Sequence, residues 1–109
     1  MATLTVQSVV RGGLEATTSA AAAGGDEYVN TGKQWAEFTN ASGSSITVTI
    51  VLQQTIDGLA VANRTVIVEA GESRKIGPFP TAQYNDANSK VQFTYSDVTT
   101  FTVGVFQLN

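Results

Sequence analysis

Apolar and polar residues alternate with a period of two along much of this chain. The segment 45–53, SITVTIVLQ, has isoleucine, valine or leucine at its even positions and threonine or valine between them. Segments 90–96 and 99–109 repeat the alternation, with aromatic residues among the apolar positions. Successive side chains of a β-strand point to opposite faces, so this pattern predicts strands that bury one face.

Shorter strand patterns fill most of the remaining chain, and turn-forming residues separate them. No stretch keeps the period of an amphipathic helix. We therefore expect an all-β fold, a single antiparallel β-sandwich over residues 1–109, with either a jelly-roll or an immunoglobulin-like topology. The shorter strand patterns lie at 4–10, 34–39, 64–69 and 74–76, and the turn clusters lie at 40–44, 57–58, 70–71 and 85–89.

Residues 15–25, EATTSAAAAGG, depart from the strand pattern. Four alanines favour a short helix, but two glycines follow at once and no apolar face is present. A helix this short is marginal in water. We expect an Ala/Gly-rich loop that is flexible or becomes ordered on a partner, so that residues 1–25 comprise an N-terminal strand or arm and this loop.

The segment 71–80, GESRKIGPFP, places two basic residues close to two prolines. In a strand Arg74 and Lys75 point to opposite faces, so they do not form a joint anion site. The prolines end the strand because proline cannot donate a hydrogen bond to a sheet. We predict a terminated sheet edge: Phe79 closes one end of the sandwich, Arg74 pairs with a carboxylate, and Lys75 faces solvent or a partner.

The composition excludes several classes of chemistry. The chain has no cysteine and no histidine, so it offers no thiolate, imidazole, disulfide or zinc site with nitrogen or sulfur ligands. A net charge of −3 with only six basic residues argues against nucleic-acid binding. No apolar run suffices for a membrane helix, and the N-terminus lacks a signal-peptide pattern. We expect no enzymatic activity, no metal and no cofactor.

The acidic residues do not change this expectation. Asp26 and Glu27 are adjacent, so in a strand their side chains point to opposite faces and do not converge on one ligand. Asp57 and Asp86 stand beside turn-forming residues, where aspartate is favoured because it bonds to the local backbone. Turn and surface roles are the preferred interpretation of all four.

Three aromatic residues have two interpretations. Tyr28, Trp35 and Tyr84 could form a platform on which a sugar stacks, as in carbohydrate-binding β-sandwiches. The alternative, which we prefer, is packing in the core and at its rim, because Tyr and Trp are commonly buried with one polar end satisfied.

Several strand patterns carry apolar residues on both faces, whereas a two-layer sandwich has one inner face per sheet. Some of these side chains must lie under a loop, at a sheet edge or in an interface with another protein. We therefore predict a capsid or subunit interface that includes residues from the N-terminal segment, the double-faced strands and the basic pair. These are Leu4, Val6, Val51, Ile67, Lys75 and Phe106.

Three blocks, residues 23–50, residues 57–80 followed by YND at 84–86, and residues 91–108, resemble small β-rich proteins of tailed bacteriophages. Such proteins are encoded among the head genes and are regarded as head decoration, or cement, proteins. The resemblance implies a structural virion protein, made in the host cytoplasm and bound outside the capsid lattice. It also implies the major capsid protein as partner and a symmetric oligomer, with a trimer favoured.

Two functional hypotheses follow. The first is a capsid decoration protein that stabilises the head by bridging capsomers, since modest contacts to several neighbours reinforce one another. The second is a ligand-binding β-sandwich, either a carbohydrate-binding module or a fibre or adhesion module. Neither hypothesis requires a nucleic acid or a membrane as partner.

Overall fold

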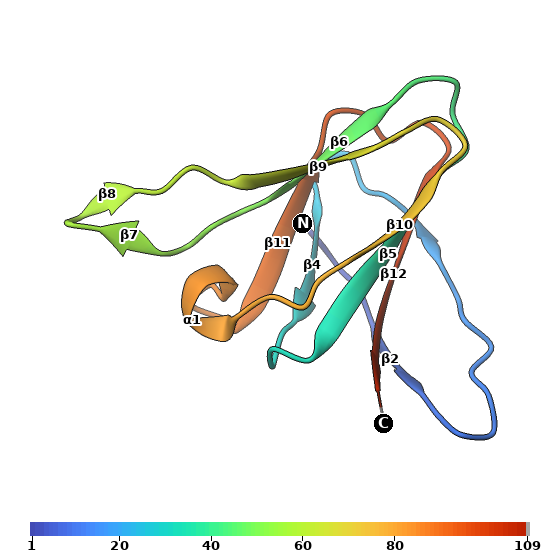
Figure 1. The fold of residues 1–109 in the computed structure, drawn as a ribbon, viewed down its shortest axis with the longest axis horizontal. Helices are drawn as coiled ribbons and strands as arrows, with labels where there is room; N and C mark the ends of the chain where they lie inside the picture. Colours follow the sequence, from blue (N-terminus) through green and yellow to red (C-terminus); the bar gives the residue numbers. More distant parts are fainter. Residues whose placement is uncertain (109) are drawn as a thin grey trace.

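A computed structural model describes residues 1–108 and shows an all-β protein with two facing sheets and a separate hairpin (Figure 1). The first sheet has the order β1-β4-β11-β6-β9, and the second has the order β10-β5-β12-β2, with β3 also paired to β12. The strands are β1 (Ala2–Thr3), β2 (Val6–Val9), β3 (Ser19–Ala20), β4 (Asp26–Val29), β5 (Gln34–Asn40), β6 (Ile46–Ile50), β7 (Thr55–Ile56), β8 (Leu59–Ala60), β9 (Arg64–Val68), β10 (Ser73–Ile76), β11 (Lys90–Tyr95) and β12 (Phe101–Leu108), and the one short helix in this part of the chain is α1 (Thr81–Tyr84).

The strand order answers the question of topology that the sequence left open. With the hairpin β7-β8 left aside as a sheet of its own, successive strands from β3 to β12 cross from one sheet to the other, except β6 and β9, which are neighbours. The result is β3, β12, β5 and β10 in one sheet and β4, β11, β6 and β9 in the other, which is the arrangement of a jelly roll. The expected all-β sandwich is therefore present.

The sequence predicts antiparallel pairing throughout, but two pairs of strands are parallel. β1 runs parallel to β4, with Ala2 opposite Asp26, and β2 runs parallel to β12, with Val6 opposite Val105. Both exceptions involve the first nine residues, which lie along the edges of the two sheets. The N-terminal segment thus adds one edge strand to each sheet.

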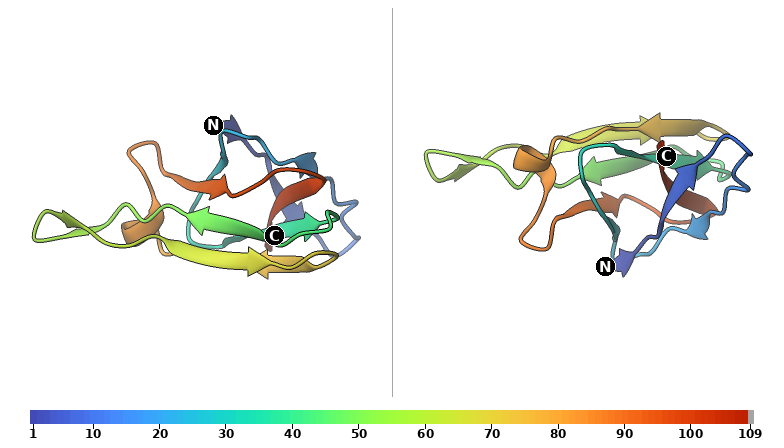
Figure 2. Two further views of the ribbon diagram at one scale, coloured as in Figure 1. Left: turned by 90° about the horizontal axis from the view of Figure 1, so that it is seen from above. Right: turned by 90° about the horizontal axis from the view of Figure 1, so that it is seen from below.

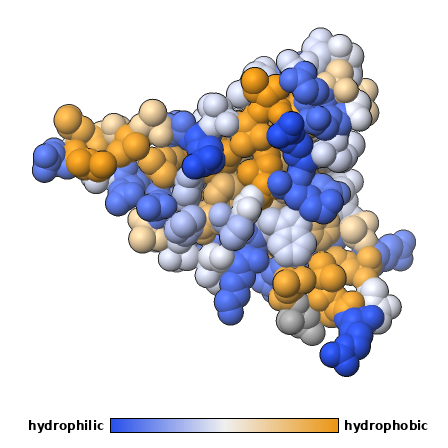
Figure 3. All heavy atoms as spheres, viewed as in Figure 1, coloured by the Kyte–Doolittle hydropathy of each residue, from blue (hydrophilic) through white to orange (hydrophobic). Residues whose placement is uncertain are grey.

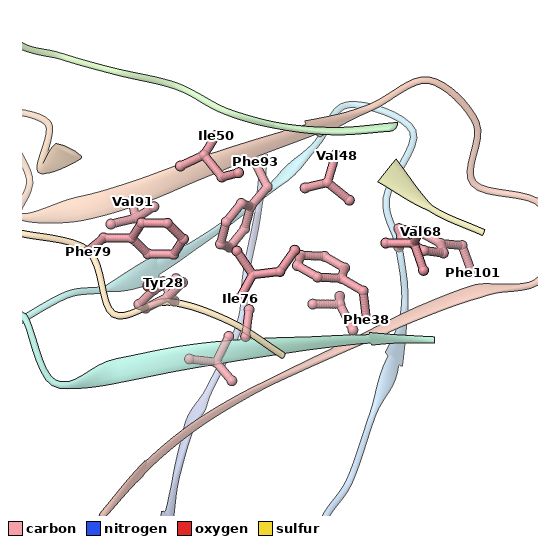
Figure 4. Close-up of a cluster of buried hydrophobic side chains, with 14 of the residues drawn as sticks. Tyr28, Phe38, Val48, Ile50, Val68, Ile76, Phe79, Val91, Phe93 and Phe101 are labelled. Atoms are coloured by element: carbon pink, nitrogen blue, oxygen red, sulfur yellow. The ribbon is translucent and has the colours of Figure 1, made fainter. Parts of the chain in front are cut away.

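Aromatic side chains from both sheets fill the space between them (Figure 4). Phe38 of β5 meets Phe93 of β11 edge to face, with ring centroids 5.3 Å apart, and lies parallel to Phe101 of β12 at 5.5 Å. The predicted alternation is confirmed in β6, where Ile46, Val48 and Ile50 are buried. These contacts hold the two sheets together.

The Ala/Gly-rich segment 15–25, which we expected to be a loop along its whole length, contains a short strand. Ser19 and Ala20 form β3, which pairs with β12, and Ala21 is buried in the core. A tight turn follows, in which the amide of Gly25 donates to the carbonyl of Ala22 at 2.9 Å and Gly25 adopts a φ of 93°. Small side chains suit this segment because it packs closely against β12.

The turn before β11 is organised by Asp86. Its carboxylate accepts hydrogen bonds from the backbone amides of Asn88 (2.8 Å) and Lys90 (3.0 Å) and from the side-chain amide of Gln92 (2.7 Å). Partial burial removes water from this carboxyl and raises its pKa. The three hydrogen bonds outweigh that effect and hold the pKa below its usual value.

We expect Asp86→Ala to lower the free energy of unfolding at neutral pH by about 1 kcal/mol. Because the pKa of Asp86 is lower in the folded state, its contribution is present above about pH 4 and is lost as the pH falls through the folded-state pKa. Urea denaturation of both proteins at neutral and at strongly acidic pH measures this. An equal difference at the two pH values would contradict the assignment.

Candidate functional site

A hollow lies where the two sheets come together at one edge. β9 is the last strand of the first sheet and β10 is the first of the second, and they run along the same side of the molecule (Figure 2). The hollow, which we call the groove, has a volume of about 470 Å³. It is lined by Arg64 and Val66 of β9, residues 74–80, and Gln83 and Tyr84 of α1.

The groove combines apolar and basic side chains. Ile76 and Phe79 are buried against the core, and Val66 is partly buried beside them. Hydrophilic side chains flank the apolar surface on this face (Figure 3). Arg64 lies at the rim, where its Nε donates to the Tyr84 hydroxyl at 3.2 Å.

The basic residues of the groove differ in their partners. Arg74 pairs with Glu72 at 2.6 Å, and this hydrogen bond holds the pKa of the Glu72 carboxyl below its usual value. Lys75 pairs with Glu37 at 2.7 Å. None of the three ion pairs formed within residues 1–108 involves Arg64. The predicted carboxylate partner of Arg74 is thus confirmed, and Arg64 is the cation of the groove without one.

One buried asparagine fixes the wall of the groove. Asn30, at the end of β4, donates through its amide to the Phe79 carbonyl at 3.0 Å and to the Asn85 side chain at 2.7 Å, and it accepts from the Gly32 amide at 3.0 Å. Phe79 packs on Tyr84 and Phe93, so it closes this end of the sandwich as predicted. The loop after β10 is therefore fixed by the hydrogen bond from Asn30 and by the packing of the Phe79 ring.

A hairpin extension, which we call the finger and define as residues 51–63, leaves the body beside the groove. Figure 1 shows β7 and β8 at its far end, well away from the sandwich. Asp57 (φ 52°) and Gly58 (φ 74°) form its two-residue turn, a geometry typical of Asp-Gly hairpins. Ile56 and Leu59 flank this turn and are 63% and 72% exposed.

The base of the finger is anchored, whereas its tip is not. The amides of Gln53 and Gln54 both donate to the carbonyl of Gln83 in α1, at 2.9 and 3.2 Å. The amide of Leu52 donates to the Asn63 side chain at 2.9 Å across the two arms. The direction of the finger is therefore set by α1, which is also a wall of the groove.

A smaller hollow of about 220 Å³ lies on the outer face of the second sheet, beside Trp35 and Phe106. The rings of these residues lie 6.2 Å apart, and the chain at Leu14 and Ala16 lines the same hollow. Phe106 is only 6% exposed. This predicted capsid or subunit interface residue is therefore covered by its own chain, because residues between β2 and β3 fold back over the outer face of β12.

The other predicted interface residues come from different parts of the fold. Leu4 and Val6 are partly buried against the core, and Val51 is partly buried at the start of the finger. Ile67 of β9 is 50% exposed, and Lys75 of β10 is exposed but paired with Glu37. Ile67 and Lys75 are therefore the members of the predicted set that are most accessible to a partner.

The aromatic platform, which was the alternative to core and rim packing, is not formed. Tyr28 is fully buried and stacks on Phe93 at 5.7 Å, and burial raises the pKa of its phenol well above the usual value. Tyr84 is buried against Phe79. Trp35 projects from the outer face of β5, away from both. The interpretation as core and rim packing is confirmed, because neither tyrosine has a ring face free for a sugar.

The adjacent carboxylates of β4 diverge, as expected for a strand. Asp26 points inward and accepts a hydrogen bond from the Tyr95 hydroxyl at 2.7 Å, whereas Glu27 pairs with Lys90 at 3.3 Å. Asp26 is nevertheless buried rather than at the surface. Burial, followed by the hydrogen bond to Asp26, raises the pKa of Tyr95 well above its usual value.

Sequence reasoning missed the residues that make the groove and the finger distinctive. The sequence predicts Arg64 only as the start of a strand, and no signal in the sequence places it beside residues 74–76, because β9 and β10 belong to different sheets. The Asp57-Gly58 pair was recognised as a turn, but the exposure of Ile56 and Leu59 beside it was not.

Within residues 1–108, no three acidic side chains cluster closely enough to hold a metal ion, and no helix has the length and apolarity needed to cross a membrane. Comparisons with models of known families, with curated proteins and with solved structures found no match to this chain.

Proposed function

We propose that this chain is a structural virion protein of a tailed bacteriophage, a decoration protein that binds the outer surface of the capsid and bridges capsomers. One observation supports this most. Its exposed large apolar side chains are spread over several separate parts of the fold and do not form a single site. They are Met1, Val9, Val10, Val29, Ile56, Leu59, Ile67 and Leu108.

A protein that contacts several neighbours at once needs such a distribution. Exposed apolar patches commonly mark protein contacts, and a modest contact gains strength once a second one has been made on the same lattice. The sparse charge of the surface, with 14% charged residues, also lowers the cost of removing water from these contacts. We propose the major capsid protein as partner and a structural rather than an enzymatic role.

Empty expanded heads that lack this protein provide the test. We expect the purified protein to sediment with such heads, to saturate at a fixed ratio to the major capsid protein, and to raise the temperature at which heads break. Ile67→Ser is expected to weaken binding about tenfold, because it removes an exposed apolar contact. Asn88→Ser, in an exposed turn, is the control. Absence of binding by the unmodified protein would refute the proposal.

A further inference from the structure

The two apolar side chains at the finger tip lie outside the hydrophobic core formed by residues 1–108. Ile56 and Leu59 are directly opposite each other in the hairpin, so their side chains point to the same face. Both are mostly exposed. A two-stranded hairpin is marginally stable in water unless it packs against something else. The tip therefore has the properties of a surface that another molecule covers.

The tip cannot reach the groove of its own chain. The finger ends at Asn63, and Arg64 of the groove follows directly, so the groove lies at the base of the finger. The amides of Gln53 and Gln54 fix this base on α1, and the tip extends away from the body (Figure 1). An occupant of the groove must come from a second molecule.

The tip and the groove are complementary in charge and polarity. Asp57 is the sole charged residue of the finger, and it lies between the two exposed apolar side chains. The groove offers an apolar floor at Ile76 and Phe79, with Arg64 at its rim. Since no carboxylate of residues 1–108 pairs with Arg64, this cation is available to one from another chain.

We propose that the finger tip of one copy docks in the groove of a second copy. Asp57 then pairs with Arg64 of the neighbour, while Ile56 and Leu59 cover the apolar floor. Finger and groove are different surfaces, so a repeated contact gives an open chain of copies unless it is reciprocal or closes into a ring; the proposal is a closed form, either a reciprocal pair or a ring. This contact does not depend on capsid binding, so its failure would leave the proposed function standing.

Sedimentation of the purified protein over a wide range of concentration tests the contact. We expect a concentration-dependent closed oligomer. The double variant Ile56→Ser, Leu59→Ser is expected to raise the dissociation constant at least about tenfold, and Arg64→Gln by a similar factor. Asp57→Asn keeps a residue that suits the turn and removes the other half of the same ion pair, so it is expected to weaken association about as much as Arg64→Gln does.

Val29→Ser is the matched control, because Val29 is 48% exposed in β4, outside both finger and groove. It is expected to associate like the unmodified protein. All substituted side chains are solvent-exposed, and circular dichroism checks that each variant remains folded. A monomer at every concentration would overturn the proposal, and so would association that the finger and groove variants leave unchanged.

Cysteine cross-linking locates the contact, because the natural chain has no cysteine. Leu59→Cys at the tip and Gln83→Cys at the groove are made in separate chains and mixed under oxidising conditions. We expect a disulfide-linked heterodimer to accumulate faster than in a mixture of Leu59→Cys with Asn88→Cys, whose turn lies outside the groove. Equal rates in the two mixtures would contradict docking of the tip in the groove.

Discussion

Replacing Phe93 with alanine is expected to lower the free energy of unfolding by about 3–5 kcal/mol. Phe93 has no exposed surface and contacts three other rings, those of Phe38 at 5.3 Å, Tyr28 at 5.7 Å and Phe79 at 6.0 Å. Phe38 belongs to the opposite sheet and Phe79 closes one end of the sandwich. Truncation would therefore leave a cavity at the junction of the two sheets and the groove wall.

Equilibrium denaturation in urea measures this loss. Phe93→Leu retains most of the buried volume, so it is expected to cost markedly less than the alanine variant, about 1–2 kcal/mol. If Phe93→Ala does not fold at all, the leucine variant still measures the site. A loss below about 1 kcal/mol for the alanine variant would show that the ring is not at the centre of the core.

Asn30→Ala is expected to destabilise the protein by about 2–4 kcal/mol, because removal of a buried amide leaves its partners without hydrogen bonds. The Phe79 carbonyl, the Asn85 side chain and the Gly32 amide each lose one bond. Two of these partners flank the groove. The variant should therefore loosen the segment between β10 and β11 in addition to lowering global stability.

Denaturation together with amide hydrogen exchange separates these two effects. Asn30→Asp keeps an acceptor for the Gly32 amide but loses both donated bonds, so it is expected to resemble the alanine variant. Asn85→Ala, which removes a partly exposed member of the same network, is expected to cost less. Unchanged exchange in segment 77–85 of Asn30→Ala would contradict its role in fixing the groove wall.

The strands could be predicted from sequence where one of their faces is buried throughout. Segments 45–53, 90–96 and 99–109 contain β6, β11 and β12. Residue 109, at the end of the third segment, lies outside the described residues. Alternation carries this information because the inward-facing apolar side chains of these strands meet the opposite sheet. Strand termini were predicted less well, since the apolar pattern of 45–53 continues into the finger.

The first thirty residues were predicted least well. β4 begins with two carboxylates, and the carboxylate of Asp26 is buried where the hydroxyl of Tyr95, distant in sequence, and the backbone amide of Ala22 donate to it. β3 lies in an alanine run whose small side chains suit close packing against β12. Local sequence cannot reveal either condition, because both depend on which distant strand lies alongside.

The groove and the finger could not be predicted as a site for a related reason. Arg64 and Arg74 line one groove because the edges of two sheets meet, and this arrangement follows from the order of all the strands. For the same reason, the sequence could not show whether the three aromatic residues would lie on one surface. Tyr28 and Trp35 are close in sequence, but Tyr28 lies in the core between the two sheets, whereas Trp35 lies on the outer face of the second sheet.

Density maps of intact phage heads test the central proposal most directly. We predict a jelly-roll body, matching residues 1–108, on the outer surface of the mature capsid at sites that join neighbouring capsomers. Heads from a phage that lacks the gene should lose this density and break at a lower temperature. Identical maps with and without the gene, or density for this chain in the tail alone, would contradict a role in capsid decoration.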